Sequence, residues 1–308
     1  MKKRTITGAF ILLALVLFVS LRHFNTYFFD VLIGIICICS SYEVSKVLNN
    51  AKFYNEATIT MIFPVLYYLA FMICKTREIS FGYFSLIILG IILLLVLITL
   101  LCIILSKKTI KQEIGKKSYK KYVLDKTLTT LFTLAYPTLL LGSLFILNHA
   151  GEFSWFNTQI SSDLGLLLIV MLFAVSMLTD TFAYLVGSLV KGPKLCPTIS
   201  PKKTISGAIG GLIGGIIACV SCYLVANSIL SVNELFVSLN VSWWQFLICG
   251  LIGSIFTQIG DIFASIIKRK AFTKDYSNIF PGHGGFMDRC DGLSFNAIVV
   301  LIFALILF

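Results

Sequence analysis

The chain has 308 residues, of which 58% are hydrophobic and only 13% are charged. Soluble domains carry about a quarter charged residues, so this composition excludes an ordinary water-soluble protein and indicates an integral membrane protein. The net charge of +11 does not indicate nucleic-acid binding, because the Lys and Arg residues fall between apolar runs, as the positive-inside rule requires.

Nine apolar segments are long enough for a membrane-spanning helix, which needs about 20 residues. The sequence therefore predicts an all-α integral membrane protein with nine transmembrane helices, at roughly 6–21, 27–45, 58–74, 80–106, 127–148, 163–190, 205–230, 243–267 and 292–308. The first segment follows Lys2, Lys3 and Arg4 as a signal peptide would. It lacks a convincing cleavage site, so we interpret it as an uncleaved helix.

The basic residues also predict the orientation. With a cytoplasmic N-terminus, all but three of the 25 Lys and Arg residues lie on the inner side, the exceptions being Arg22, Lys75 and Arg77. An odd number of spans then places the C-terminus outside. The polar segments 191–204 and 268–291 are both expected at the cytoplasmic face.

No linker separates independent domains, so we expect one continuous membrane domain. Its polar chemistry is uneven, because residues 175–292 contain nearly all of the acids and glycine clusters recognised at membrane depth. We therefore expect a scaffold in residues 1–150 and a catalytic half in residues 151–308.

Asp180 and Asp261 fall inside predicted spans. Insertion of an acidic side chain into the centre of a membrane span costs roughly 2.5–3.5 kcal/mol. Such a side chain normally faces a cavity, a partner or an ion. Each shares a helix face with polar or small residues and a lysine: Tyr184, Gly187 and Lys191 for Asp180, Ser265 and Lys268 for Asp261. A structural pair with lysine explains a lone acid about equally well, but two such faces leading to one side favour a shared site.

Segment 200–215 combines cations with glycines. Gly207, Gly211 and Gly215 recur every four residues and create a smooth helix face for close packing. Packing alone does not explain the polar residues ahead of them, which are Ser200, Lys202, Lys203 and Thr204. Hydroxyls and lysines before a helix N-terminus could bind phosphate, although the spacing is not that of a Walker A loop.

The stretch FPGHGGFMDRCDG, residues 280–292, is expected to end the last inner loop. Its glycines permit tight turns. Asp288 and Asp291 could converge on a hard cation, and Arg289 could bind phosphate with two hydrogen bonds. His283 could be a base, a donor or, as for most lone loop histidines, a structural residue. Acids and cations together predict a site for metal-bound polyphosphate next to lipid.

These residues resemble the signature of the phosphatidate cytidylyltransferases (CDP-diacylglycerol synthases). The positions that match it in spacing are Ser265, Ile267, Lys268, Arg269, Lys274, Asp275, Ser277, Phe280, Pro281, His283, Gly284, Gly285, Phe286, Asp288, Arg289 and Asp291. Upstream, TDTFAYLVG and ISPKKTISGAIGG also resemble family blocks. Cys290 and Ser206 depart from the family pattern, Ser206 standing where glutamate is usual. The match covers residues 175–295 closely and the first five spans by hydropathy only.

The resemblance implies a Mg²⁺-dependent enzyme that converts CTP and phosphatidate, a membrane lipid, into CDP-diacylglycerol and pyrophosphate. It implies an integral protein of a bacterial plasma membrane, with the active site facing the cytoplasm and a possible homodimer. Under this hypothesis the catalytic residues are Asp261, Asp288, Lys268, Arg289 and His283. Asp261 and Asp288 would hold the metal, with Asp291 and Asp180 as further candidates. The substrates would be bound by Ser200, Lys202, Lys203, Ser265, Arg269, Lys274, Gly284 and Gly285.

Several alternatives stay open. The nearest is another CTP-dependent membrane lipid enzyme, such as a polyprenol kinase or an ether-lipid cytidylyltransferase. A secondary transporter would show an internal repeat with paired broken helices, and the sequence shows no such symmetry. A membrane prenyltransferase would need two aspartate-rich loops, of which only one is clear.

Overall fold

The computed structural model describes residues 2–107, 110, 116–152, 155–156, 163–228, 234 and 236–308. Within these residues, nine helices are long and apolar enough to cross a membrane. The predicted all-α integral membrane fold is confirmed, whereas the orientation of the termini stays a prediction.

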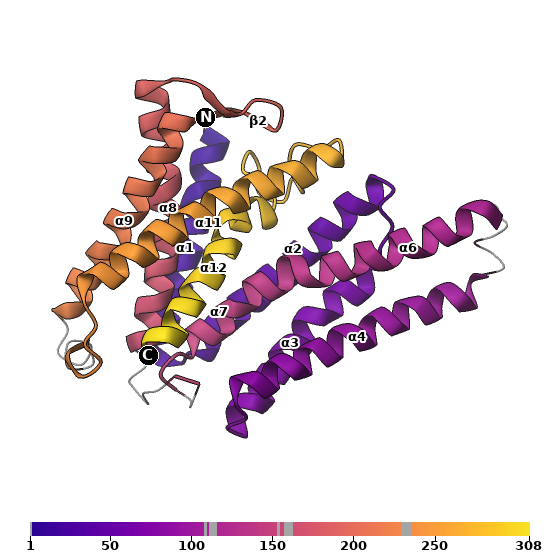
Figure 1. Cartoon of the computed structure of the whole chain (residues 1–308), viewed down its shortest axis with the longest axis horizontal. Helices are drawn as coiled ribbons and strands as arrows, with labels where there is room; N and C mark the ends of the chain where they lie inside the picture. Colours follow the sequence, from indigo (N-terminus) through magenta and orange to yellow (C-terminus); the bar gives the residue numbers. More distant parts are fainter. Residues whose placement is uncertain are drawn as a thin grey trace. The chain divides into compact units, whose positions relative to one another are not determined.

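The helices and strands follow one another along the chain as labelled in Figure 1. The helices are α1 (Lys2–Phe24), α2 (Tyr27–Asn50), α3 (Ala57–Thr76), α4 (Phe81–Leu105), α6 (Lys116–Thr133), the π-helical turn η1 (Leu134–Leu139), α7 (Leu140–Asn148), α8 (Asp163–Val190), α9 (Ile205–Asn227), α11 (Trp243–Lys270) and α12 (Met287–Leu307). Strands β1 (Lys194–Cys196) and β2 (Ser200–Thr204) pair antiparallel, with Lys194 opposite Thr204.

The structure differs from the sequence prediction in three places. The fifth span begins at Tyr119, well before 127, and Lys126 inside it forms an ion pair with Glu56. The ninth span begins at Met287, so the acids expected in a loop lie on a helix. A β-hairpin precedes α9 because Lys191 and Gly192, with φ of 56° and 117°, turn the chain at the end of α8.

The chain divides into two compact units, each built from three segments. The first unit comprises Met1–Val16, Val31–Gly142 and Lys270–Met287, and the second comprises Leu17–Asp30, Ser143–Arg269 and Asp288–Phe308. These two units are defined by how the chain packs. The scaffold half and the catalytic half expected from the sequence are defined by function, and they stay a prediction.

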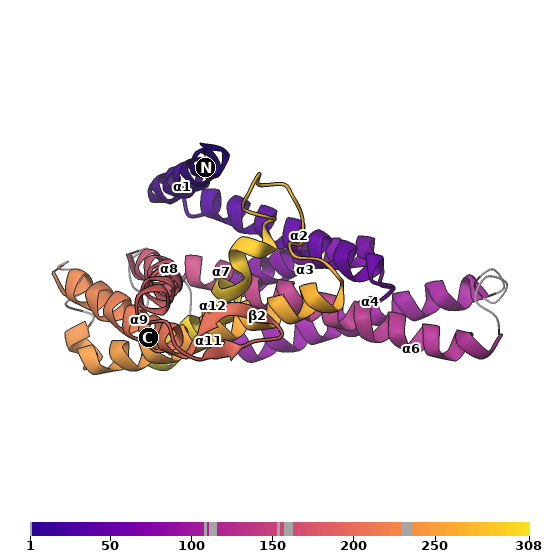
Figure 2. The same cartoon turned by 90° about the horizontal axis from the view of Figure 1, so that it is seen from above.

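Aromatic packing joins helices within the first unit. Tyr67 and Phe71 of α3 both meet Phe84 of α4 edge-on, with ring centroids 5.5 and 6.4 Å apart. A buried hydrogen bond of 2.9 Å between the hydroxyls of Ser41 and Thr138 joins α2 to η1. Figure 2 shows α4 and α6 running side by side, in agreement with their packing.

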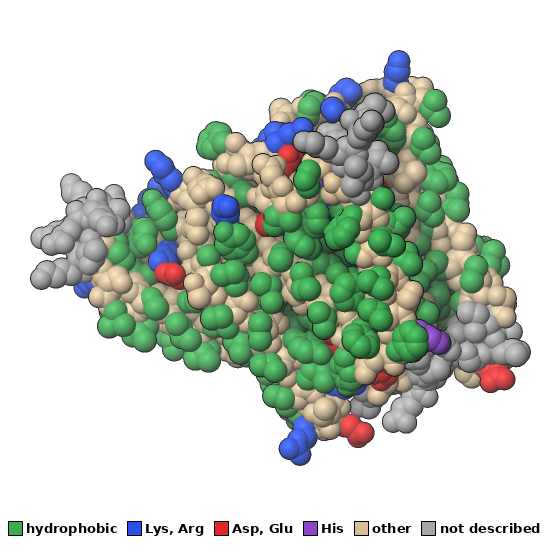
Figure 3. All heavy atoms as spheres, turned by 180° about the vertical axis from the view of Figure 1, so that it is seen from behind, with side chains coloured by type: hydrophobic (Ala, Val, Ile, Leu, Met, Phe, Trp, Pro, Cys, Tyr) green, Lys and Arg blue, Asp and Glu red, His purple; other side chains and the backbone are tan. Residues whose placement is uncertain are grey.

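The second unit contains α8 and α9, which lie side by side in Figures 1 and 2, together with α11 and α12. On the face shown in Figure 3, hydrophobic side chains cover most of the described surface. Helix α4 of the first unit also exposes apolar side chains, since Leu93 and Leu97 expose 61% and 62% of their surface. Such apolar exposure suits lipid as the surrounding solvent.

Candidate functional site

A pocket of about 370 Å³ lies in the second unit, among α8, the β-hairpin, α9 and α11. Asp180 of α8 and Asp261 of α11 both line it, as do Lys202 and Lys203 of β2. The two acids thus line one pocket, as the sequence predicts, while the use of this pocket as a functional site stays a prediction. The pocket combines carboxylates and ammonium groups, which is the chemistry of a phosphate or metal-phosphate site.

Glycines allow the backbones around this pocket to approach closely. A Cβ at Gly187 of α8 would lie 3.2 Å from the Cα of Gly207 in α9 and 2.8 Å from Thr204 Oγ1. Thr204 caps α9, because its hydroxyl accepts a 3.1 Å hydrogen bond from the Gly207 N–H. The end of the β-hairpin is therefore fixed against α8, beside the pocket.

The glycine face predicted on α9 also packs against α11. A Cβ at Gly215 would lie 2.5 Å from the Ser254 Cβ, and one at Gly211 would lie 3.0 Å from Gln258 Nε2. Gln258 donates a 3.2 Å hydrogen bond to the Ala208 carbonyl and lines the pocket. This close packing confirms the expected role of the glycines, and it brings Asp261, three residues after Gln258, to the pocket.

Two lysines bind acids that come from other elements. Lys203 Nζ lies 3.0 Å from Asp261 Oδ2. Lys268 Nζ lies 2.8 Å from Asp288 Oδ1 and 3.8 Å from Asp291 Oδ2. The structural-pair interpretation thus holds for Asp261, while Asp180 forms no ion pair with another described residue.

Helices α11 and α12 meet at two glycines. A Cβ at Gly260 would lie 2.5 Å from the Asp291 carbonyl, and one at Gly292 would lie 2.8 Å from Asp261 Oδ1. Asp261 is therefore adjacent to the first turns of α12, as the sequence hypothesis requires. Because α12 begins at Met287, Asp288 and Asp291 lie one turn apart on a helix, where Lys268 can reach both.

The remaining predicted residues of the second unit lie outside the lining of this pocket. Arg269 is exposed and its Nε donates a 3.4 Å hydrogen bond to the Ile199 carbonyl, next to Ser200 at the start of β2. Ser265 is half-buried one turn beyond Asp261, and Arg289 is exposed on α12. None of these residues lines the pocket.

Lys274, His283, Gly284 and Gly285 belong to the first unit, within its segment Lys270–Met287. Gly284, like Gly282, has a positive φ, 81° and 79° respectively. The Phe280 N–H donates to the Gly284 carbonyl at 2.8 Å, so the predicted glycine turn is confirmed. His283 Nδ1 is buried without a hydrogen-bond partner among the described residues, and Lys274 is exposed.

The sequence analysis missed one acid that contacts this segment. Glu43 of α2 is 1% exposed, and its carboxylate accepts hydrogen bonds from Ser277, Phe286 and Met287. A signal was available, since Glu43 lies within the predicted span 27–45 and an acid there is costly. Glu43 and Asp30, which are 1% and 4% exposed, thus add buried acids to the residues that the sequence analysis expected to be scaffold.

The donor set fits a magnesium ion that arrives with a nucleotide. Across the part of the chain that the structure describes, no three His, Cys, Asp or Glu side chains are grouped to hold a metal ion. Mg²⁺ usually takes one or two protein carboxylates and completes its shell with water and substrate phosphates. Asp180 and Asp261, which line one pocket, meet that requirement.

Comparisons with known proteins agree on one family. A family model described as "Cytidylyltransferase family" matches residues 2–307. A phosphatidate cytidylyltransferase of Staphylococcus saprophyticus is 42% identical over 131 residues, which are 42% of this chain and 46% of that protein. Another, of Brucella abortus biovar 1, is 39% identical over 142 residues, which are 46% of this chain and 48% of that protein. The aligned region thus spans just under half the length of these curated relatives.

Proposed function

This chain belongs to the cytidylyltransferase family, and we propose that it transfers the cytidylyl group of CTP to phosphatidate, forming CDP-diacylglycerol and pyrophosphate. The observation that carries this proposal is the pocket in which Asp180 and Asp261 lie together with Lys202 and Lys203. The names of the relatives supply the substrates, and the charged pocket in an apolar helical protein supports both a polyphosphate and a lipid.

The reaction brings two polyanions together. A phosphate oxygen of phosphatidate forms a bond to the α-phosphorus of CTP. The bond from that phosphorus to the oxygen bridging towards the β-phosphorus breaks, and pyrophosphate leaves with this oxygen. The attacking oxygen is already ionised near neutral pH, so positioning and charge neutralisation matter more than a strong base.

Charge repulsion is the main obstacle to this attack. Two unit charges about 4 Å apart interact by about 4 kcal/mol at an effective dielectric constant of about 20. Lys202 and Lys203 would bind phosphate oxygens in the pocket, and the exposed Arg269 and Arg289 would extend the cationic surface along α11 and α12. Lys268 would bind phosphate only on leaving Asp288 and Asp291. Fixed cations of this kind stabilise developing charge without reorganisation.

Asp180 and Asp261 would hold the magnesium ion, which would supply charge neutralisation and Lewis-acid polarisation of the nucleotide phosphates. Asp288, which the resemblance made a metal ligand together with Asp261, becomes an alternative ligand here, as does Asp291, because Lys268 binds both of them and neither lines the pocket. Lys203 binds Asp261, so a phosphate that attracts Lys203 would free that carboxylate for the metal. The roles of His283, Lys274, Gly284 and Gly285 towards substrate stay predictions.

We place the protein in the bacterial plasma membrane with its pocket facing the cytoplasm, where CTP is available. The distribution of Lys and Arg supports this orientation, and the bacterial relatives support the membrane. A homodimer stays part of the proposal.

The test is a defined reaction. Purified protein in detergent is incubated with Mg²⁺, phosphatidate and CTP labelled at the α-phosphate. The expected result is label in the lipid fraction and release of pyrophosphate. In parallel reactions phosphatidate is replaced by a polyprenol or by the phosphate of an ether lipid. Release of CDP with the polyprenol would identify a kinase, and label transfer only to the ether lipid would identify the rival cytidylyltransferase.

An Asp261→Asn variant tests the site itself. Loss of the carboxylate should lower turnover by two or more orders of magnitude, as removal of a metal-binding or charge-stabilising group does. Near-normal turnover of folded variant would contradict the role of the pocket, even if the unaltered protein forms CDP-lipid.

A further inference from the structure

The buried carboxylate of Glu43, in the first unit, accepts hydrogen bonds from the segment 277–287. Glu43 Oε1 accepts hydrogen bonds from Ser277 Oγ at 2.6 Å and from the Phe286 N–H at 3.0 Å, and Oε2 accepts from the Met287 N–H at 2.8 Å. All of these residues belong to the first unit. Both oxygens are thus acceptors, as in an ionised carboxylate.

These hydrogen bonds lie at the N-terminus of α12. Met287 is the first residue of α12, and the N–H groups at the start of a helix have no partners within it. A side chain of the same segment usually caps them, and an anion is further stabilised by the helix dipole. Here the anion comes from α2, more than 240 residues earlier in the chain.

The segment is shaped to receive this side chain. A Cβ at Gly285 would overlap both carboxylate oxygens of Glu43, so only glycine allows the chain to pass so closely. Phe280 and Phe286 pack edge-on at 4.7 Å and close the turn on its other side. The packing against Glu43 therefore explains why glycine stands at position 285, independently of any contact with substrate.

We propose that Glu43 is a positioning residue, whose carboxylate fixes the start of α12 and thereby the two charged residues that follow, Asp288 and Arg289. The bonds lie within the first unit, and the chain enters the second at the peptide bond between Met287 and Asp288. The inference rests on the proposed function, because it assigns Asp288 and Arg289 to the handling of phosphate or metal. It places a functional residue in the part of the chain expected to be scaffold.

The test compares Glu43→Gln with Glu56→Gln. Glutamine places an NH₂ donor against an N–H or hydroxyl donor, whereas Glu56 pairs with Lys126, which is not part of this segment. Hydrogen exchange of peptides covering residues 280–290 reports the hydrogen bonds directly. We expect faster exchange there in Glu43→Gln and no local change in Glu56→Gln.

Kinetics separate positioning from mere stabilisation. Loss of a hydrogen bond to a charged group corresponds to a change of about tenfold or more in an equilibrium constant. Glu43→Gln should therefore raise the half-saturating concentration of Mg²⁺ or CTP by about that factor. Glu43→Asp, which keeps the charge, should recover part of the loss. Ser277→Ala, which deletes one bond only, should give a smaller shift and serves if Glu43→Gln does not fold.

The outcomes are distinct. Unchanged exchange at residues 280–290, or a lower yield of folded protein with unchanged Mg²⁺ and CTP dependence, would overturn the inference while leaving the proposed function standing. Absence of CDP-lipid formation by the unaltered protein would overturn the proposed function, and with it the catalytic purpose given to Glu43.

Discussion

Lys268 of α11 binds Asp288 of α12, with 2.8 Å between Nζ and Oδ1, and the Asp288 side chain is only 3% exposed. The same Nζ lies 3.8 Å from Asp291, so one lysine is within ion-pair distance of two carboxylates at the start of α12. A buried pair is weak evidence for stability, but removing one partner leaves an uncompensated charge.

Lys268→Met should therefore destabilise the protein strongly. Breaking a buried pair costs about 3–5 kcal/mol, because the Asp288 carboxylate would keep its burial and lose its cation. Unfolding in detergent, followed by circular dichroism, measures the loss. The neighbouring Lys270 is exposed, and Lys270→Met should change stability by no more than about 0.5 kcal/mol. Equal stability of the two variants would contradict the importance of the pair.

Lys203→Met should affect substrate binding more than folding. The Lys203 and Asp261 side chains are 29% and 20% exposed, so solvent screens their pair and the structural loss should be small, about 1 kcal/mol or less. The KM for CTP should rise about tenfold, as expected for one charged phosphate contact. Lys194→Met, on the other strand of the hairpin, is the control; an equal rise there would indicate a general charge effect.

Gly187→Ala should damage the packing around the pocket. The new Cβ would lie 2.8 Å from Thr204 Oγ1 and 3.2 Å from the Gly207 Cα. Overpacking of this kind costs about 1–3 kcal/mol, and a displaced β-hairpin should also lower turnover. Gly90→Ala is the matched control, because nothing lies within 4 Å of its Cβ position. It should be neutral or slightly stabilising, since alanine favours a helix by about 0.5–1 kcal/mol.

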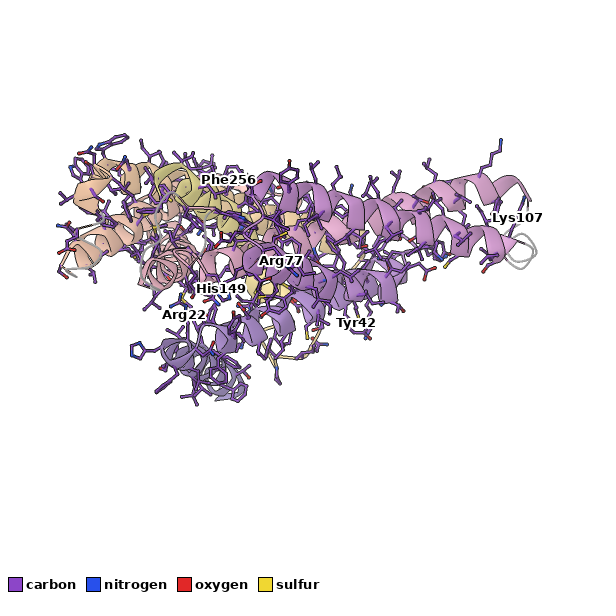
Figure 4. The ribbon with its side chains drawn as sticks, turned by 90° about the horizontal axis from the view of Figure 1, so that it is seen from below. Arg22, Tyr42, Arg77, Lys107, His149 and Phe256 are labelled. Atoms are coloured by element: carbon purple, nitrogen blue, oxygen red, sulfur yellow. The ribbon has the colours of Figure 1, made fainter. Side chains whose placement is uncertain are left out.

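Asn148→Leu should destabilise the second unit without altering CTP binding. Arg22 Nε donates to Asn148 Oδ1 at 2.7 Å, and Asn148 Nδ2 donates to Asp30 Oδ1 at 2.8 Å. His149, labelled with Arg22 in Figure 4, continues this buried network to the other Asp30 oxygen at 2.8 Å. Losing the amide costs about 1–3 kcal/mol for each buried group deprived of its partner.

Thermal unfolding and initial rates together check this last variant. A lower unfolding temperature with an unchanged KM for CTP is expected. A changed KM in folded protein would mean that the polar network of Arg22, Asn148 and Asp30 takes part in substrate binding.

Particular elements show which features can be predicted from the sequence. The nine predicted spans are visible in the hydropathy of the sequence. In lipid each spanning segment must hydrogen-bond its own backbone N–H and C=O groups, so it forms a long, continuous apolar helix. The glycines of α9 are visible because their four-residue spacing defines one helix face. The hairpin at 194–204 was missed, because the turn at Lys191 and Gly192, which Gly192 and Pro193 indicate, does not by itself specify that paired strands follow.

The partners of the charged residues were not predictable in the same way. Asp261 and Lys268 were expected to share a face, but two helical turns separate them by about 10 Å along the axis. Asp261 instead meets Lys203, 58 residues away, and Lys268 meets Asp288. Glu43 meets a segment more than 230 residues later, a distance at which no local pattern operates.

The sequence by itself determined that this is a helical membrane protein whose polar chemistry lies in a few segments, because hydropathy and helical spacing are properties of neighbouring residues. Only the tertiary structure decided that Asp180 and Asp261 share a pocket with the hairpin lysines, that Lys268 binds Asp288, and that Glu43 binds the start of α12. Such pairs form when glycine-lined helices pack closely enough for charges to meet, and that proximity is not encoded at any one position of the chain.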